Sequence, residues 1–167
     1  MNIGLYIVNN TSNKLKNSIS GGGIYIWKSK NVYNIHCTYI GNSAYFGGGL
    51  NIRKCENVTY INHCIFTVNR AFRGGGLMME QIRNVYHIYS TYMRNSASNY
   101  GGGAYMINIV NTVHINCKYD QNINFGSKAS HGGGLYIRKS KNVSQINCKY
   151  TSNKAQGKGS GGAIHIW

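Results

Sequence analysis

The sequence predicts an all-β fold in which one chain winds into a single-stranded parallel β-helix, a solenoid. Three recurring patterns predict it. A Gly-Gly-Gly triplet starts at residues 21, 47, 74, 101 and 132, and Gly161-Gly162-Ala163 is a variant of it. An apolar-x-apolar stretch follows each triplet, and an aromatic-x-x-Asn motif precedes the next one. The triplets are 26 to 31 residues apart, a period typical of stacked repeat architectures.

The repeat organises the whole chain, residues 1–167, as one domain. A solenoid needs several repeats because no single repeat can bury its own apolar face. Both partial coils lack an evident polar cap, so we expect end-to-end stacking with further coils or with other chains. We expect about five full coils, 21–46, 47–73, 74–100, 101–131 and 132–160, with partial coils at 1–20 and 161–167.

The first strand of each coil follows the glycine triplet. Its first and third residues are apolar, and its middle residue should face outward because successive side chains alternate between the faces of a strand. The outward position carries tyrosine in three coils, at Tyr25, Tyr105 and Tyr136. The glycines should permit positive φ angles and close approach of neighbouring coils.

Asparagine recurs about ten residues after the start of each triplet, before a second strand. We predict that these asparagines form an inward column, in which buried amides bond to one another and to the backbone. An isoleucine in the second strand should stack in the same way, at 35, 61, 88, 115 and 146. One extra residue between Ile61 and Cys64 is interpreted as a β-bulge. The asparagines are Asn31, Asn57, Asn84, Asn111 and Asn142.

Four of the five cysteines share one position of the repeat: Cys37, Cys64, Cys117 and Cys148, with Ser90 in the third coil. A column of small residues indicates a core position, where free cysteine acts as a compact hydrophobic residue. Disulfides between neighbouring coils stay an alternative, because the spacing between coils fits a disulfide although parallel side chains make bridging awkward. Metal binding is a further alternative.

Each coil ends in aromatic-x-x-Asn, from Tyr39-x-x-Asn42 to Tyr150-x-x-Asn153. The run Cys-x-Tyr-x-x-Asn also resembles part of the leucine-rich repeat consensus, which makes that fold the structural alternative. A leucine-rich repeat would need a helical or leucine-rich return segment. Here a glycine triplet and a second strand occupy that place, which favours the β-helix.

The repeat resembles that of the polymorphic membrane protein family, defined by a GGAI motif and an FxxN motif. Gly161-Gly162-Ala163-Ile164 matches the first motif and Phe66-Thr67-Val68-Asn69 the second, and close variants cover essentially the whole chain. The resemblance implies a right-handed β-helix of the pectate-lyase-like superfold and an adhesin displayed on a cell or virion surface. The chain departs from the family in its strong basicity, and we find no export signal, translocator barrel or membrane span in it, so the localisation stays open.

Eighteen Lys and Arg residues against three acids give a net charge of +15, which makes polyanions natural partners. Many cations fall in the turn after the first strand, where stacking predicts a basic edge beside the outward tyrosines. This edge would bind an acidic glycan or a nucleic acid, unless it is only a solvated edge. Residues 107–110 interrupt it in the fourth coil. The cations are Lys28, Lys30, Arg53, Lys54, Arg83, Arg138, Lys139 and Lys141.

Catalytic chemistry has little support in the sequence. Glycosidases need paired carboxylates and calcium-dependent lyases need clustered ones, whereas Glu56, Glu80 and Asp120 lie at non-equivalent positions of different coils. His87 and His114 share a position that we expect to face outward, and His36 and His63 nearly share another, but no third ligand completes a metal site. We therefore expect no enzyme, no catalytic residue and no cofactor.

The sequence thus favours a non-enzymatic, adhesin-like repeat scaffold whose outward faces bind a protein surface or a glycan. A polyanion-binding module that uses the basic edge is the alternative. A protein like a polysaccharide lyase or hydrolase is the third possibility.

Overall fold

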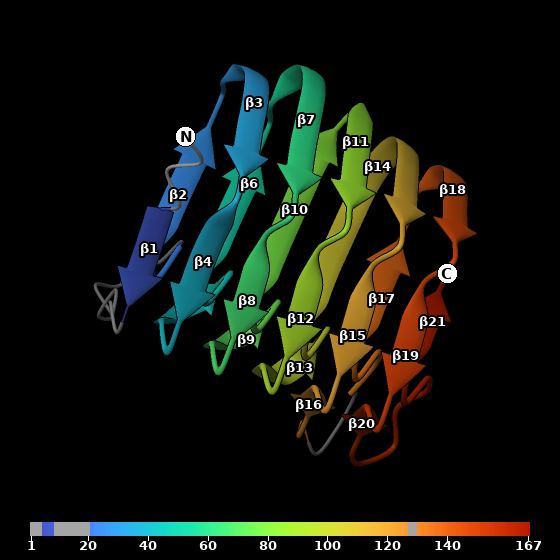
Figure 1. The fold of residues 1–167 in the computed structure, drawn as a ribbon. Coiled ribbons are helices and arrows are strands. Elements are labelled where there is room, and N and C mark those ends of the chain that lie inside the picture. Colours follow the sequence, from blue (N-terminus) through green and yellow to red (C-terminus); the bar gives the residue numbers. More distant parts are fainter. Residues whose placement is uncertain (1–4, 9–20, 127–129) are drawn as a thin grey trace.

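The computed structural model describes residues 5–8, of which only the backbone is considered, and residues 21–126 and 130–167. Most of the predicted partial coil 1–20 thus lies outside the described residues. Every regular element in these ranges is a β-strand, and the strands pair in parallel to form a solenoid of about five turns. In Figure 1 the coils follow one another from left to right while the near strands run downward and the far strands upward, which is a right-handed winding. The predicted β-helix is confirmed.

The described ranges contain no helix of the length and apolarity needed to cross a bilayer.

Each full coil contributes to four sheets, which we name A to D. Sheet A contains β1 (Leu5–Val8), β4 (Cys37–Ile40), β8 (Ile65–Thr67), β12 (Thr91–Met93), β15 (Lys118–Asp120) and β19 (Lys149–Thr151). Sheet B contains β5 (Ser43–Phe46), β9 (Arg70–Arg73), β13 (Ser96–Tyr100), β16 (Ile123–Asn124) and β20 (Lys154–Ala155).

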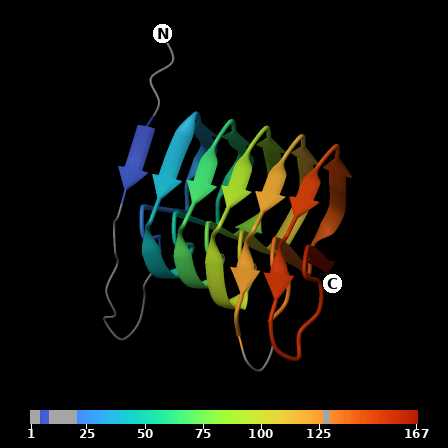
Figure 2. The same ribbon diagram turned by 60° about the horizontal axis from the view of Figure 1, so that its bottom comes forward.

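Sheets C and D are joined because β14 runs from one into the other. Sheet C contains β2 (Ile24–Trp27), β6 (Leu50–Arg53), β10 (Leu77–Ile82), the first half of β14 (Ala104–Ile115), β17 (Leu135–Arg138) and β21 (Ile164–Ile166). Sheet D contains β3 (Lys30–Ile35), β7 (Glu56–Asn62), β11 (Asn84–Ile88), the second half of β14 and β18 (Lys141–Ile146). In Figure 2 the coils form a row of stacked loops, and the segment 156–160 after β20 extends below most of them.

Residues with positive φ turn the chain from one sheet into the next. Lys54 (φ 54°) lies between sheets C and D, His63 (φ 50°) between D and A, and Val68 (φ 57°) between A and B. The corner from B to C is the first glycine of each triplet, such as Gly74 (φ 65°). A Cβ atom on the following Gly75 would overlap the carbonyl oxygen of Gly102 one coil further on. The triplet therefore serves both the turn and close packing of coils, as predicted.

Equivalent residues of successive coils lie above one another in columns. The aromatic column of sheet A faces the interior, and its ring centroids lie 4.7 to 4.8 Å apart, which matches the spacing of paired strands. Apolar residues of sheets C and D complete this core, with Leu50, Ile52 and Val85 among those fully buried. The members of the aromatic column are Tyr39, Phe66, Tyr92, Tyr119 and Tyr150.

The asparagine of the aromatic-x-x-Asn motif forms the buried polar column, made of Asn42, Asn69, Asn95, Asn122 and the half-buried Asn153. Asn95 Oδ1 accepts hydrogen bonds from the backbone N–H and from Nδ2 of Asn69, both at 3.0 Å. Asn95 Nδ2 in turn donates to the carbonyl oxygen of Phe66 at 2.8 Å and to Oδ1 of Asn122 at 3.0 Å. The amides of Asn69, Asn95 and Asn122 therefore join their own coils to both neighbours.

The asparagine column that the sequence analysis placed inside lies at the surface, so that prediction is wrong. Asn31, Asn57, Asn111 and Asn142 are exposed and Asn84 is half-exposed. Four of the five have positive φ, which turns them out at the corner where sheet D begins. The side chains still bond along the column: Nδ2 of Asn111 donates to Oδ1 of Asn84 at 3.0 Å, and Nδ2 of Asn142 to Oδ1 of Asn111 at 2.8 Å.

The predicted isoleucine column is also wrong in one coil. Ile61 pairs with Asn34 and His87 in an inward column, whereas Ile35 and Ile146 are 44% and 45% exposed in an outward one. The register between β3 and β7 shifts between Lys30 and Val32, so the extra residue of the second coil precedes Ile61 instead of following it.

Buried tyrosine hydroxyls in sheet A each have a polar partner five residues earlier in sheet D. In the second coil the partner position is Ile61, and there the aromatic residue is Phe66, which has no hydroxyl. In the aromatic column of sheet A, tyrosine thus occurs only where a polar side chain of sheet D bonds to its hydroxyl. The pairs are Tyr39 with Asn34 (2.8 Å), Tyr92 with His87 (3.0 Å), Tyr119 with His114 (3.1 Å) and Tyr150 with Gln145 (2.9 Å).

The substitution Asn95→Ala should lower the free energy of unfolding by about 2–4 kcal/mol, because it leaves the buried Asn69 N–H without its acceptor and removes a hydrogen bond to the Phe66 carbonyl. Urea unfolding measures the change. Asn84→Ala is the control: water replaces its exposed hydrogen bonds, so the expected loss is below about 1 kcal/mol. Equal losses in the two variants would contradict the division into a buried and a surface column.

The substitution Phe66→Tyr should destabilise the protein by about 1–3 kcal/mol, because the added hydroxyl would meet the apolar Ile61. Ile61→Asn introduces the residue that stands at this position in the first coil, as Asn34. The double variant should therefore be more stable than the sum of the single losses by at least about 1 kcal/mol. Denaturant unfolding of the four proteins gives this coupling, and strictly additive losses would refute the pairing.

Candidate binding surfaces

The predicted basic edge lies at the corner between sheets C and D, but it is interrupted by acids as well as by the fourth coil. Lys28, Lys30, Lys54, Arg83, Lys139 and Lys141 are exposed, whereas Arg53 and Arg138 are half-buried. Glu56 pairs with Lys30 at 3.4 Å, and Glu80 pairs with Arg53 at 2.6 Å. Asn108 and Val110 occupy the cation positions of the fourth coil. The cations therefore form separate groups along this corner.

Two of the three tyrosines expected beside that edge are buried. Tyr25 is 44% exposed as predicted, but Tyr105 and Tyr136 are 1% and 4% exposed. Tyr105 and Tyr136 do point outward from sheet C, but the residues that precede the glycine triplets pack over the outer face of this sheet. Tyr105 and Tyr136 consequently form a second apolar cluster with Met78, against which Phe46 and Tyr100 pack.

Arginine side chains lie over aromatic rings beside this cluster, at the glycine corner. The guanidinium carbon of Arg73 lies 5.7 Å from the ring centroid of Phe46 and 5.3 Å from that of Tyr100. Arg53 also lies over Phe46, at 5.9 Å, and Arg138 lies over Trp167 at 4.6 Å. Such cation–π contacts stabilise a guanidinium next to an apolar surface. Arg53 and Arg138 therefore have a packing role in addition to their charge.

A pocket of about 270 Å³ lies next to Tyr100 and Tyr136 of this cluster. Burial lowers the pKa of His131, and the neighbouring His165 and Arg138 lower it further. His131 Nδ1 accepts a hydrogen bond from the Ser160 N–H at 3.1 Å. The lining consists of aromatic and basic residues, Tyr100, His131, Tyr136, Arg138, His165 and Trp167.

Sheet D carries an aromatic face on its outer side. The rings of Tyr33 and Tyr60 stack at 5.6 Å and those of Tyr60 and Tyr86 at 5.0 Å. At the adjoining corner His36, His63 and Tyr89 stack at 5.0 and 4.9 Å. This surface was not predicted from the sequence, although tyrosine recurs two or three residues after the asparagine in three consecutive coils.

All three carboxylate side chains of the chain form ion pairs. Besides Glu56 and Glu80, Asp120 pairs with Lys118 at 3.4 Å. Each acid lies in a different coil and beside a cation. Among the described residues no three His, Cys, Asp or Glu side chains are grouped as a metal site would need.

The cysteine column faces the core, and the described cysteines are all free thiols. Cys64 Sγ donates to the carbonyl oxygen of Asn34 in the preceding coil at 3.1 Å, and Ser90 Oγ donates to that of Ile61 at 3.2 Å. Cys37 and Cys117 are buried too, while Cys148 is half-buried. Burial raises the pKa of Cys64 to about 12, which leaves it a poor nucleophile. Serine and cysteine thus fill one structural position.

His87 and His114 face the core and are completely buried, so the prediction that they face outward is wrong. Both histidines stand at the position that Ile61 and Asn34 occupy in the earlier coils. Placing the extra residue of the second coil after Ile61, instead of before it, hid this alignment. The ring centroids lie 4.6 Å apart, and each Nδ1 contacts the hydroxyl of its tyrosine partner. Burial lowers the pKa of His114 to about 3. Burial, and after it the charge of the neighbouring His114, lowers the pKa of His87 well below 6.5.

Comparisons of the chain with protein-family models, with curated proteins and with solved structures found no match.

Acid should destabilise the protein through the buried histidine pair. Histidine in the unfolded chain binds a proton near pH 6.5, whereas His114 stays neutral in the folded protein down to about pH 3. The unfolded state therefore binds more protons in this window, and stability should fall as the pH falls through it, by up to about 1.4 kcal/mol per pH unit for each histidine. Urea unfolding across this range measures the slope.

The variant His114→Gln should reduce this pH slope, because Gln145 shows that glutamine fits the same column. His63→Asn is the matched control, because it removes a histidine from an exposed corner position and leaves the buried pair intact. A slope that stays the same in His114→Gln would show that the pair does not govern acid stability.

Proposed function

We propose that this protein is a non-catalytic, adhesin-like β-helix scaffold that binds the surface of a partner protein through the outer face of sheet D. The observation that carries the proposal is the uncovered band of aromatic and branched side chains on this face. Tyr33 is 61% exposed, and Ile35 and Ile146 are nearly half exposed in the adjoining column. Monomeric soluble proteins rarely leave large contiguous apolar patches uncovered unless they bind something.

The way in which the rings stack favours a protein partner over a sugar. Tyr33 and Tyr60 are nearly parallel, with planes 7° apart, and Tyr60 and Tyr86 are 16° apart. Each ring therefore covers the face of its neighbour and presents its edge and hydroxyl outward. A sugar needs a free ring face to stack on, whereas ring edges, hydroxyls and branched aliphatic groups suit the mixed surface of a protein.

The repeat itself supports assignment to the polymorphic membrane protein type. The asparagine of its FxxN motif, Asn69 in the matching copy, supplies hydrogen bonds that join neighbouring coils. The glycines of its GGAI motif make the corner between sheets B and C. Motif residues with such structural roles are what a repeat family would share while its outward residues vary with the partner.

The triple variant Tyr33→Ser, Tyr60→Ser and Tyr86→Ser should bind at least tenfold more weakly, because tyrosines at the centre of an interface contribute most of its energy. Labelled protein is added to a panel of intact cells, untreated or treated with protease or with glycosidases. Binding by the unaltered chain should be lost after protease treatment, should survive glycosidases, and should persist at moderate salt.

The matched control is the triple variant Lys28→Gln, Lys54→Gln and Lys139→Gln, which changes the C–D corner and leaves sheet D intact. It should bind like the unaltered chain. Binding that survives protease treatment and vanishes on glycosidase treatment would reject a protein partner. Loss of binding in the lysine variant alone, with collapse at moderate salt, would favour a polyanion at the basic edge.

A further inference from the structure

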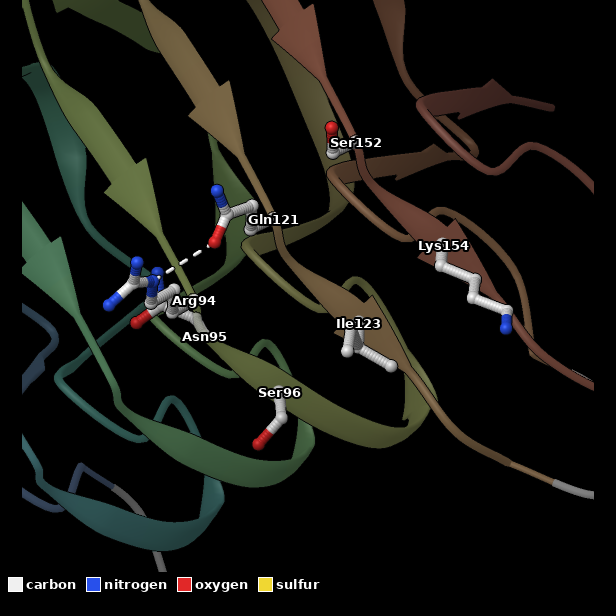
Figure 3. Close-up of a pocket in the computed structure, with 7 residues that line it drawn as sticks. All are labelled: Arg94, Asn95, Ser96, Gln121, Ile123, Ser152 and Lys154. Atoms are coloured by element: carbon white, nitrogen blue, oxygen red, sulfur yellow. Dashed lines mark hydrogen bonds between the residues drawn. The ribbon is translucent and has the colours of Figure 1, made fainter.

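The corner between sheets A and B holds a pocket of about 390 Å³ that the sequence analysis did not anticipate. It spans three successive coils. Because each buried asparagine points inward, the residues before and after it point outward and diverge, and they form the two walls of the pocket (Figure 3). The residues that line it are Arg94, Asn95, Ser96, Gln121, Ile123, Ser152 and Lys154.

The side chains in this pocket offer donors and no carboxylate. Arg94 Nε donates to Gln121 Oε1 at 3.0 Å, which orients both side chains and leaves the guanidinium amino groups and the glutamine amide N–H directed to solvent. Ser96 and Ser152 add hydroxyls. Within the described part of the chain, neither Arg94 nor Lys154 forms an ion pair. Asp120, the residue before Gln121, is paired with Lys118.

The separation of the two cations defines the kind of anion. Arg94 belongs to the third coil and Lys154 to the fifth, so their backbones are about 10 Å apart along the axis, two strand spacings, and their side chains extend in different directions (Figure 3). A single oxyanion cannot contact both. A chain with repeated acidic groups can place one at each cation, while its hydroxyls meet the serines and Gln121 between them.

A polysaccharide fits these walls better than a nucleic acid. Proteins that bind single-stranded nucleic acid stack bases on exposed aromatic rings. The pocket lining contains no aromatic residue, and its apolar part is the aliphatic Ile123. Hydroxyl and amide groups beside cations are instead the partners that an acidic sugar chain requires.

We propose that this corner pocket binds an acidic polysaccharide, with Arg94 and Lys154 each holding one sulfate or carboxylate group and Gln121 lying between them. The site is separate from the aromatic face of sheet D and uses a different chemistry. The protein would then combine a face for a protein partner with a site for an acidic glycan on another side of the same rod.

The test measures binding of the full chain to a heparin oligosaccharide of defined length, which carries sulfates, and to an oligogalacturonate, which carries carboxylates. The variant R94Q/K154Q should lower the affinity at least tenfold and reduce the slope of log affinity against log salt by about two, one for each cation removed. Glutamine suits position 94 because Gln121 occupies the equivalent corner with φ 52°.

The control variant K28Q/K54Q removes the same charge from the C–D corner. It should lose less than threefold in affinity, and Y33S/Y60S/Y86S should bind both probes like the unaltered chain. Equal losses in R94Q/K154Q and K28Q/K54Q would show that net charge alone attracts the probe and would overturn the proposal. Failure of both saccharides to bind would overturn it as well, as would equally tight binding of oligodeoxythymidylate with the same loss in R94Q/K154Q.

Discussion

The hydrogen bonds between buried asparagine amides hold successive coils in one register, and the rest of the structure depends on that register. Side chains alternate between the two faces of a strand, so a slip of one residue would exchange the interior with the surface. Asn69 and Asn95 prevent the slip because each amide bonds to the backbone and to the side chain of a neighbouring coil. The aromatic and cysteine columns, three and five residues earlier in the chain, follow the same alignment, and so do the outward columns that form binding surfaces.

Much of the fold could be predicted because the repeat is regular, but periodicity does not reveal which face a residue occupies. Asn31 and Asn42 each head a column with the same period, and only the second column is buried. Alternation from Cys37 through Tyr39 indicates the inward side of sheet A and would have been the better guide. The single extra residue near Asn57 also led to a wrong face. Its position in the strand was mispredicted, and His87 and His114 were therefore assigned to the outer face.

The binding surfaces were less predictable, because they depend on contacts between segments far apart in a coil. Tyr105 does point away from sheet C, as its strand pattern indicates, yet the chain before the glycine triplet covers it. No local sequence pattern shows that another segment of the chain covers Tyr105. The pocket beside Asn95 arises from the divergence of the two flanking residues, which becomes visible only once the inward asparagines are identified. Conversely, Tyr33, Tyr60 and Tyr86 repeat plainly in the sequence and could have been recognised.

The pairing of Ile61 with Phe66 has a consequence for how such a chain can change over generations. Each of the two residues suits only the other, while the remaining coils carry a polar side chain with tyrosine at the same two places. A lineage that altered one member alone would pass through a less stable intermediate. Duplication or exchange of an entire coil transfers both members at once and avoids that intermediate, so the whole coil is the natural unit of inheritance in this rod.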